Sequence, residues 1–344
     1  MTTQENIVTS TTTEAPASVL PAQKSPLRRF IVPMVALAIG ALALLWAGGS
    51  GFRQDLLVMV AVYALIALGM YIPFVMAGSM SMAYAAYAAI GAYSVAIITT
   101  ETSLPPILGW IIGPLISATV AVILSLLTRR LSGFYLAAVT LLFSMAFEPW
   151  VIALEPITGG SAGIGGIPAP TLFGWEAPRL LLIAIALALV IAVATLVERI
   201  RTGAWGISVR TMRDVPSAVE AMGVRTTTLT TVTLAVGAAV ASLAGALFVS
   251  FMLSITPETF TLSMVFMALF VPLIGGQASA WGCVIGAIVV IQLTSNMPSS
   301  FEGSGQLVLA IGVLLILLVA PAGLIGYAKA LIAWVRRRFG KDRS

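Results

Sequence analysis

Long apolar runs, separated by short segments that contain glycine, proline or charged residues, occupy most of the chain. A helix that crosses a bilayer needs about 20 mostly apolar residues. Ten runs approach that length, at 30–47, 55–76, 80–100, 106–127, 133–154, 180–197, 229–252, 261–275, 281–297 and 305–320. The pattern predicts an all-α polytopic transmembrane helical bundle of about ten spans. The run 261–275 is short and contains Pro272, which favours a tilted, broken or re-entrant segment there.

The composition excludes a water-soluble protein and most familiar enzyme chemistries. Of 344 residues, 59% are hydrophobic and 9% are charged, which is far more apolar than a soluble core requires. The chain has no histidine and a single cysteine, Cys283. It therefore lacks the residues for a Cys/His zinc site, an internal disulfide, a Ser-His-Asp triad or a histidine-ligated haem. We expect no metal site and no enzymatic activity in this chain.

The positions of the basic residues predict how the chain is oriented. Lysine and arginine in short loops are retained on the cytoplasmic side of a membrane. When the ten runs are threaded from a cytoplasmic N-terminus, only Arg53 and Arg179 of the 18 basic residues fall outside. We therefore expect a multi-pass protein of the cell (inner) membrane with both termini in the cytoplasm. This distribution explains the net charge of +5, and the basic segment 336–343 is expected to contact anionic membrane lipid. No nucleic acid partner is expected.

Three parts follow from this organisation. Residues 1–26 are rich in Thr, Ser, Ala and Pro, and carry too few apolar side chains to offset the entropy of ordering them. They are expected to form a disordered cytoplasmic N-terminal tail. Residues 27–328 form the transmembrane domain, and residues 329–344 form a basic cytoplasmic C-terminal tail.

One polar loop, 198–228, is much longer than a connector between two spans requires. Its local signals predict two short helices, at 205–213 and 215–222. The second helix has three expected boundary residues: the N-cap Asp214, Pro216 in the first turn, and the left-handed stop Gly223. A plain connector rich in positive charge is one interpretation. The capped, amphipathic pattern favours the other, a helical hairpin at the cytoplasmic surface that docks a soluble partner.

Five stretches carry distinctive combinations of glycine, small and aromatic residues. They are GSMSMAYAAYAAIGAYSVAI (78–97), GFYLAAVTLLFSMAF (133–147), ITGGSAGIGGIP (157–168), the loop 206–223 followed by VGAAVASLAGALF (236–248), and VPLIGGQASAWGCVIGAIVV (271–290). In this order they resemble the permease subunits of branched-chain amino acid ABC transporters. The resemblance covers about residues 55–325.

The resemblance implies a permease fold like that of type II ABC importers, with an ATPase-coupling loop and a loop that faces a binding protein. The implied coupling residues are Gly206, Arg210, Arg213, Asp214, Ala218, Glu220 and Gly223, and the implied binding-protein-facing residues are Thr158, Gly159 and Gly160. The implied partners are a second permease subunit in a homologous heterodimer, two cytoplasmic ATP-binding subunits and an outer-face solute-binding protein. The chain has no G-x-x-x-x-G-K-[ST] phosphate loop, so no cofactor is expected in it. ATP and Mg²⁺ are expected on the partner ATPases.

Four polar residues within or between apolar runs are candidates for the translocation path. They are Glu148, Gln277, Gln292 and Asn296. A carboxylate inside a span is costly and usually faces a cavity or a partner, although Glu148 also lies close enough to the outer surface to reach lipid headgroups beside Trp150. Interhelical hydrogen bonds explain the three amides equally well.

The sequence therefore predicts the membrane-spanning permease subunit of an ABC importer for branched-chain amino acids. Two alternatives stay open at this point. One is a related ABC permease for urea, amides or monosaccharides, which the same architecture would serve. The other is an ion-coupled secondary transporter, in which Glu148 would be the titrating group.

Overall fold

The computed structural model describes residues 28–295 except Ser103, Ser132, Phe173, Gly174 and Ala177. It also describes residues 311, 312, 314, 318 and 323–327. The two predicted tails, the candidate path residue Asn296 and most of the predicted run 305–320 lie outside the described residues.

Each of the other nine apolar runs contains a helix. These helices are α1 (Arg28–Ala47), α2 (Gly51–Met70) with its π-helical extension η1 (Tyr71–Met76), α3 (Tyr84–Glu101), α4 (Ile107–Leu127), α5 (Phe134–Ala153), α7 (Arg179–Thr202), α10 (Thr226–Met252), α11 (Leu262–Gly275) and α12 (Trp281–Ser295). Apart from two-residue strands β1 (Thr171–Leu172) and β2 (Trp175–Glu176), the regular structure of the described residues is helical.

Six helical segments of the described chain are long and apolar enough to cross a membrane. They are α2 with η1, α4, α5, α7, α10, and α11 together with the short η3 (Pro257–Thr259) that precedes it. The helices α1 and α12 are apolar but shorter by this measure. The prediction of a polytopic helical bundle is thus confirmed at the level of six candidate spans.

The helix α11 is short, as its sequence predicted. Its 14 residues rise only about 21 Å, whereas a bilayer core is about 30 Å thick.

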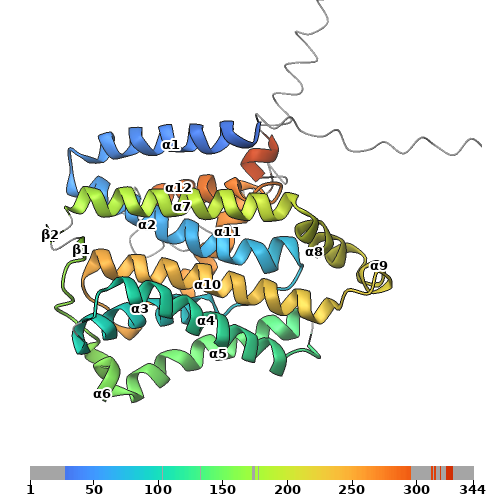
Figure 1. Ribbon diagram of the computed structural model, residues 1–344, viewed down its shortest axis with the longest axis horizontal. Helices are drawn as coiled ribbons and strands as arrows, with labels where there is room; N and C mark the ends of the chain where they lie inside the picture. The colour runs from blue at the N-terminus through green and yellow to red at the C-terminus, as the bar shows by residue number, and fades with distance from the viewer. Residues whose placement is uncertain are drawn as a thin grey trace, which may run out of the picture.

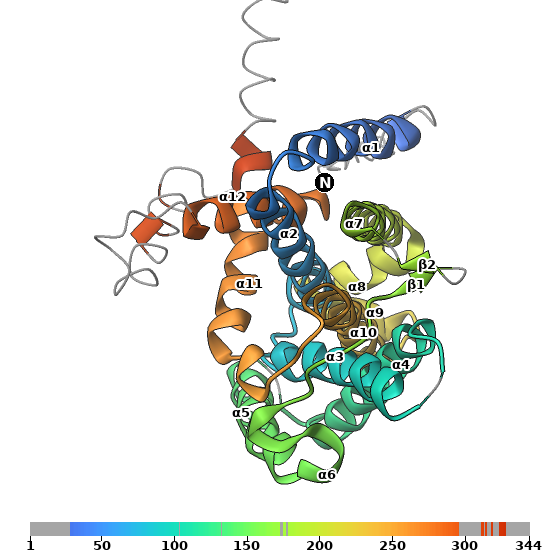
Figure 2. The ribbon, with the colours of Figure 1, turned by 90° about the vertical axis from the view of Figure 1, so that its left-hand side faces the viewer.

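The centre of the bundle is formed by α2 and α10. Both are largely buried, whereas most residues of α4 and α5 are at least partly exposed. Figure 2 looks along the bundle and shows α2 and α10 surrounded by α3, α4, α7 and α11. An apolar outer surface around a buried centre is what a helical bundle in lipid requires.

Close backbone contact explains why small residues line the central helices. A side chain at Gly245 would collide with the Ala88 carbonyl oxygen of α3, and one at Gly91 would collide with the Ser242 carbonyl oxygen of α10. The α11–α12 pair is built in the same way, because Gly286 lies against the Val271 carbonyl. These glycines therefore serve helix packing.

A proline creates a π-helical turn at the end of α2. Pro73 has no N–H to donate to the Gly69 carbonyl four residues earlier, and the helix widens to a π-helix over Tyr71–Met76. The Tyr84 hydroxyl donates a hydrogen bond to that Gly69 carbonyl oxygen, at 3.4 Å. Val75 of this π-helix contacts Arg213 of the polar loop 198–228.

The two ends of the bundle differ. Figure 1 shows α8 (Ala204–Asp214) and α9 (Pro216–Ala221) at one end, which we call the hairpin end, and α6 (Glu155–Thr158) with β1 and β2 at the other. Arg53 and Arg179, the two basic residues that the charge count placed outside, lie at the start of α2 and of α7, at the end opposite the hairpin. There Arg179 forms a 2.7 Å ion pair with Asp55. The side of the membrane on which each end lies stays a prediction.

We expect Gly245→Val to destabilise the bundle strongly, because the added side chain meets backbone that cannot move aside. Overpacking of this kind costs about 1–3 kcal/mol or more of unfolding free energy. Thermal unfolding of the detergent-solubilised protein measures the effect. The control is Gly51→Ala, since no atom lies within 4 Å of a Cβ at Gly51. Equal unfolding temperatures for the two variants would contradict the packing interpretation.

Candidate functional site

The polar loop 198–228 folds as the predicted helical hairpin. Its helices α8 and α9 match the predicted ranges to within one residue, and Gly223 ends the hairpin with a φ of +79°. Pro216 lies in the first turn of α9, as expected. The apolar side chains Val209 and Val219 are buried, so the hairpin packs against the bundle on one face.

The predicted N-cap role of Asp214 is wrong. Asp214 is the last residue of α8, and the residue before α9 is Val215, whose side chain offers no hydrogen-bond acceptor. The reason is Pro216, which disfavours helical backbone at the residue before it. Val215 is accordingly extended, with φ −141° and ψ 81°, and Asp214 remains in the preceding helix.

Arg213 anchors the hairpin to the end of α2. Its Nη1 donates a hydrogen bond to the Val75 carbonyl oxygen of η1, at 2.6 Å. The side chain passes over Gly78, which has a φ of +69° and where a Cβ would approach Arg213 Cγ to 2.9 Å. Gly78 therefore provides both the turn and the space for this contact.

Glu198 makes a second anchor that the sequence analysis missed. Its carboxylate accepts hydrogen bonds from the Arg201 guanidinium at 3.1–3.3 Å, from the Ser279 hydroxyl at 3.1 Å and from the Ala280 backbone N–H at 2.8 Å. The Glu198 and Arg201 side chains are only 25% and 15% exposed. This cluster joins the end of α7, directly before the hairpin, to the residues that open α12. The Glu198–Arg201 spacing is visible in sequence, but the contact with a turn 81 residues away is not.

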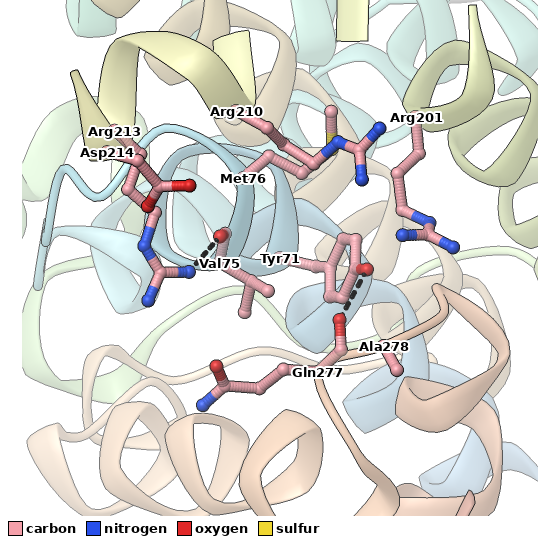
Figure 3. A pocket seen from close by; sticks show the side chains of 9 residues that line it. All are labelled: Tyr71, Val75, Met76, Arg201, Arg210, Arg213, Asp214, Gln277 and Ala278. Atoms are coloured by element: carbon pink, nitrogen blue, oxygen red, sulfur yellow. Dashed lines mark hydrogen bonds between the residues drawn. The ribbon is translucent and has the colours of Figure 1, made fainter. Parts of the chain in front are cut away.

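A cavity of about 310 Å³ lies between the hairpin, η1 and the turn before α12. Figure 3 shows the nine residues that line it: Tyr71, Val75, Met76, Arg201, Arg210, Arg213, Asp214, Gln277 and Ala278. The cavity brings together three of the implied coupling residues with Gln277, one of the candidate path residues. We call it the arginine pocket.

Charge is arranged unevenly around the arginine pocket. In Figure 3 the guanidinium groups of Arg201 and Arg210 lie on one side, near the Tyr71 hydroxyl, and Arg213 with Asp214 lies on the other. The Tyr71 hydroxyl donates to the Gln277 backbone carbonyl oxygen, at 2.9 Å. The arginine pocket is therefore lined by three guanidinium groups and one carboxylate. Such a site can hold an anionic group by charge-assisted hydrogen bonds.

The other implied coupling residues lie outside the arginine pocket. Gly206 is buried against the backbone at Ile200, and Ala218 is exposed on α9. The exposed Glu220 accepts a hydrogen bond from the Thr226 hydroxyl, at 2.9 Å.

Two candidate path residues also lie elsewhere. Glu148 is partly exposed on α5, and Gln292 is exposed on α12. Their roles in translocation stay predictions.

The Thr-Gly-Gly loop is a separate feature at the end opposite the hairpin. Thr158 is buried, and its hydroxyl donates to the Val151 carbonyl oxygen at 2.7 Å. Gly159 and Gly160 have φ values of +75° and +60°, which glycine adopts without strain. Nearby, Ile164 pairs with Ile255 through backbone hydrogen bonds of 2.9 Å in both directions. The loop is therefore tied to the segment between α10 and α11.

Comparison with known families identifies the chain. The family described as "Branched-chain amino acid transport system / permease component" matches residues 52–321, which include both anchors, the hairpin and the arginine pocket. The chain belongs to this permease family. Its members are described as permease components of a transport system. No solved structure matches the chain.

Two curated relatives support the same conclusion. Both are described as the high-affinity branched-chain amino acid transport system permease protein LivM. The protein of Salmonella typhimurium is 26% identical over 300 residues, which cover 79% of this chain and 69% of the relative. The protein of Escherichia coli is 26% identical over 339 residues, which cover 90% of this chain and 78% of the relative. The similarity therefore extends over most of both chains.

We expect Glu198→Ala to lower the free energy of unfolding by about 2 kcal/mol, because it leaves a charged donor and a backbone N–H without their acceptor. Denaturant unfolding in detergent measures the change. Glu220→Ala is the matched control, since its carboxylate is exposed and its effect should stay within about 0.5 kcal/mol. If both variants unfold alike, Glu198 is not an anchor.

Proposed function

We propose that this chain is the membrane-spanning permease subunit of an ABC importer for branched-chain amino acids. The observation that carries the proposal is the family match, which spans residues 52–321. The LivM relatives are described as branched-chain amino acid permeases, and we extend that substrate class to this chain. The ten-span count and the type II permease fold belong to the same proposal.

In this proposal the hairpin α8–α9 docks a cytoplasmic ATPase subunit. The hairpin suits that role because its inner face packs on the bundle while α9 exposes Pro216, Ser217 and Ala218. The Arg213–Val75 hydrogen bond links the hairpin to η1, and the Glu198 cluster links the preceding residues to the start of α12. Closure of two ATP-bound partner subunits would pull on the hairpin and, through these links, on two helices of the bundle. ATP and Mg²⁺ would be bound by the partners alone.

The opposite end would receive the loaded solute-binding protein, with the Thr158–Gly160 turn as part of its docking surface. A second, homologous permease subunit would complete the translocation path. Both termini and the hairpin would lie in the cytoplasm of a cell whose inner membrane holds the complex. The lower positive charge at the α6 end, with Arg53 and Arg179 as the expected outer basic residues, supports this orientation.

Two matched substitutions separate the two docking surfaces. Ala218 on α9 and Ala162 beside the Thr-Gly-Gly turn are both exposed, so tryptophan at either position adds bulk outside the core. We expect Ala218→Trp to lower the amount of ATPase that co-purifies with the tagged chain at least tenfold. Ala162→Trp should retain the ATPase but abolish stimulation of its activity by the loaded binding protein.

The assay uses the chain co-expressed with its ATPase, second permease and binding protein, followed by uptake of radiolabelled leucine into proteoliposomes. Retention of the ATPase by Ala218→Trp would exclude the hairpin as its dock. ATP-independent uptake by the chain alone would overturn the ABC assignment.

Cysteine labelling tests the orientation. Because Cys283 is buried and is the one cysteine of the sequence, a single new thiol can be placed at Ser217 or at Ser161, both exposed. In intact cells a membrane-impermeant maleimide should label Ser161→Cys, and should label Ser217→Cys only after the membrane is opened. The reverse pattern would invert the proposed topology.

A further inference from the structure

The arginine pocket combines three kinds of surface that no single inorganic ion requires. It has guanidinium groups, a carboxylate with a neighbouring carboxamide, and apolar side chains, all within about 310 Å³. That volume falls at the lower end of the usual range for small-molecule sites, about 300–1,000 Å³. The combination therefore points to a small ligand that is both charged and apolar.

On the cationic side of the arginine pocket, two guanidinium groups have N–H donors that are not engaged by the described part of the protein. A guanidinium carries five N–H donors. Within the described chain, Arg210 uses one of them on the Gly206 carbonyl at 3.4 Å, and Arg213 uses one on the Val75 carbonyl. Arg201 is the exception, because it is paired with the Glu198 carboxylate. The positive charge of Arg210 is thus available to a carboxylate ligand.

The acceptor side is supplied by Asp214 and Gln277. Among the described residues, no ion pair within 4.0 Å engages the Asp214 carboxylate. Figure 3 places it with Arg213 on the side away from Arg201 and Arg210, and places the Gln277 carboxamide below it. An ammonium group is the ligand that such acceptors fit, because ammonium has three donors and no acceptor.

The apolar side is formed by Val75, Met76 and Ala278. These side chains offer an aliphatic group a surface that removes it from water, at about 25 cal/mol per Å². A phosphate or sulfate ion would pair with the guanidinium groups but would leave this surface and the Asp214 carboxylate unused.

We propose that the arginine pocket binds a free aliphatic amino acid from the side of the membrane on which the hairpin lies. The carboxylate of the zwitterion would pair with Arg210, its ammonium group with Asp214, and its side chain would contact Val75 and Met76. The proposal rests on the proposed function, since it assigns a second site for the same substrate class, next to the ATPase dock and separate from the outer binding protein.

Ligand binding to the assembled permease–ATPase complex, in nanodiscs and without the binding protein, tests this inference. Tritiated L-leucine is the probe, and unlabelled L-leucine, 4-methylpentanoate, 3-methylbutan-1-amine and inorganic phosphate are the competitors. We expect L-leucine to compete at least tenfold better than 4-methylpentanoate, which lacks the ammonium group, or the amine, which lacks the carboxylate. Phosphate should compete no better than the amine.

Substitutions then locate the site. Ala278→Phe fills the cavity and should abolish binding, whereas Ala204→Phe, at an exposed α8 position that does not line the cavity, should leave it unchanged. Asp214→Asn preserves shape and should remove the preference for L-leucine over 4-methylpentanoate. Each variant is first checked for assembly with its ATPase by size exclusion.

Three results would overturn the inference. The first is equal competition by L-leucine and 4-methylpentanoate on the unmodified complex, which needs no variant to fold. The second is competition by phosphate as strong as that by L-leucine, which would show a general anion site. The third is full binding by an assembled Ala278→Phe complex.

Failure of the proposed function is read separately, from uptake. If the complete transporter moves another solute, the binding assay on the unmodified complex still reports whether the pocket accepts an aliphatic zwitterion.

Discussion

The close approach of α10 to α2 and α3 sets the geometry of the whole bundle. Backbone atoms meet at Gly69, Gly91 and Gly245, where any side chain would separate the helices. In a bilayer, lipid is as apolar as the helix surfaces, so tight van der Waals packing of this kind replaces the hydrophobic effect as the force between helices. This packing fixes the end of α2, which Arg213 of the hairpin contacts, and the helix α10 that follows the hairpin in the chain.

Polar contacts concentrate where this packing ends. Arg213 connects the hairpin to the Val75 carbonyl of η1. Glu198, at the end of α7 just before the hairpin, accepts hydrogen bonds from the residues that open α12. Both contacts use charge-assisted hydrogen bonds in partly buried positions, which are stronger than neutral ones and depend on direction. They hold the hairpin in a defined orientation, and the arginine pocket is the space that remains between them.

Hydrophobic pattern and turn chemistry were enough to predict the helices, the hairpin and the left-handed Gly223, because these depend on local sequence. The Asp214 cap was predicted wrongly because two local rules competed, and the effect of Pro216 on Val215 prevailed over the capping preference of Asp214. The pocket could not be predicted, since Tyr71, Arg210 and Gln277 come from segments that only the tertiary fold brings together. The family resemblance assigned roles to the hairpin residues, but only the structure shows that Gln277 lies beside three of them.

The ion pair between Asp55 and Arg179 bears on how the two ends of the bundle are connected. It joins α2 and α7 at the end far from the hairpin, and the two helices pack along each other from there. At the hairpin end, α2 continues into the segment that Arg213 holds, and α7 carries Glu198 and leads into α8. The ion pair is about half exposed and contributes at most about 1 kcal/mol, so the packing of α2 along α7, more than the pair itself, would carry a displacement of the hairpin toward the far end.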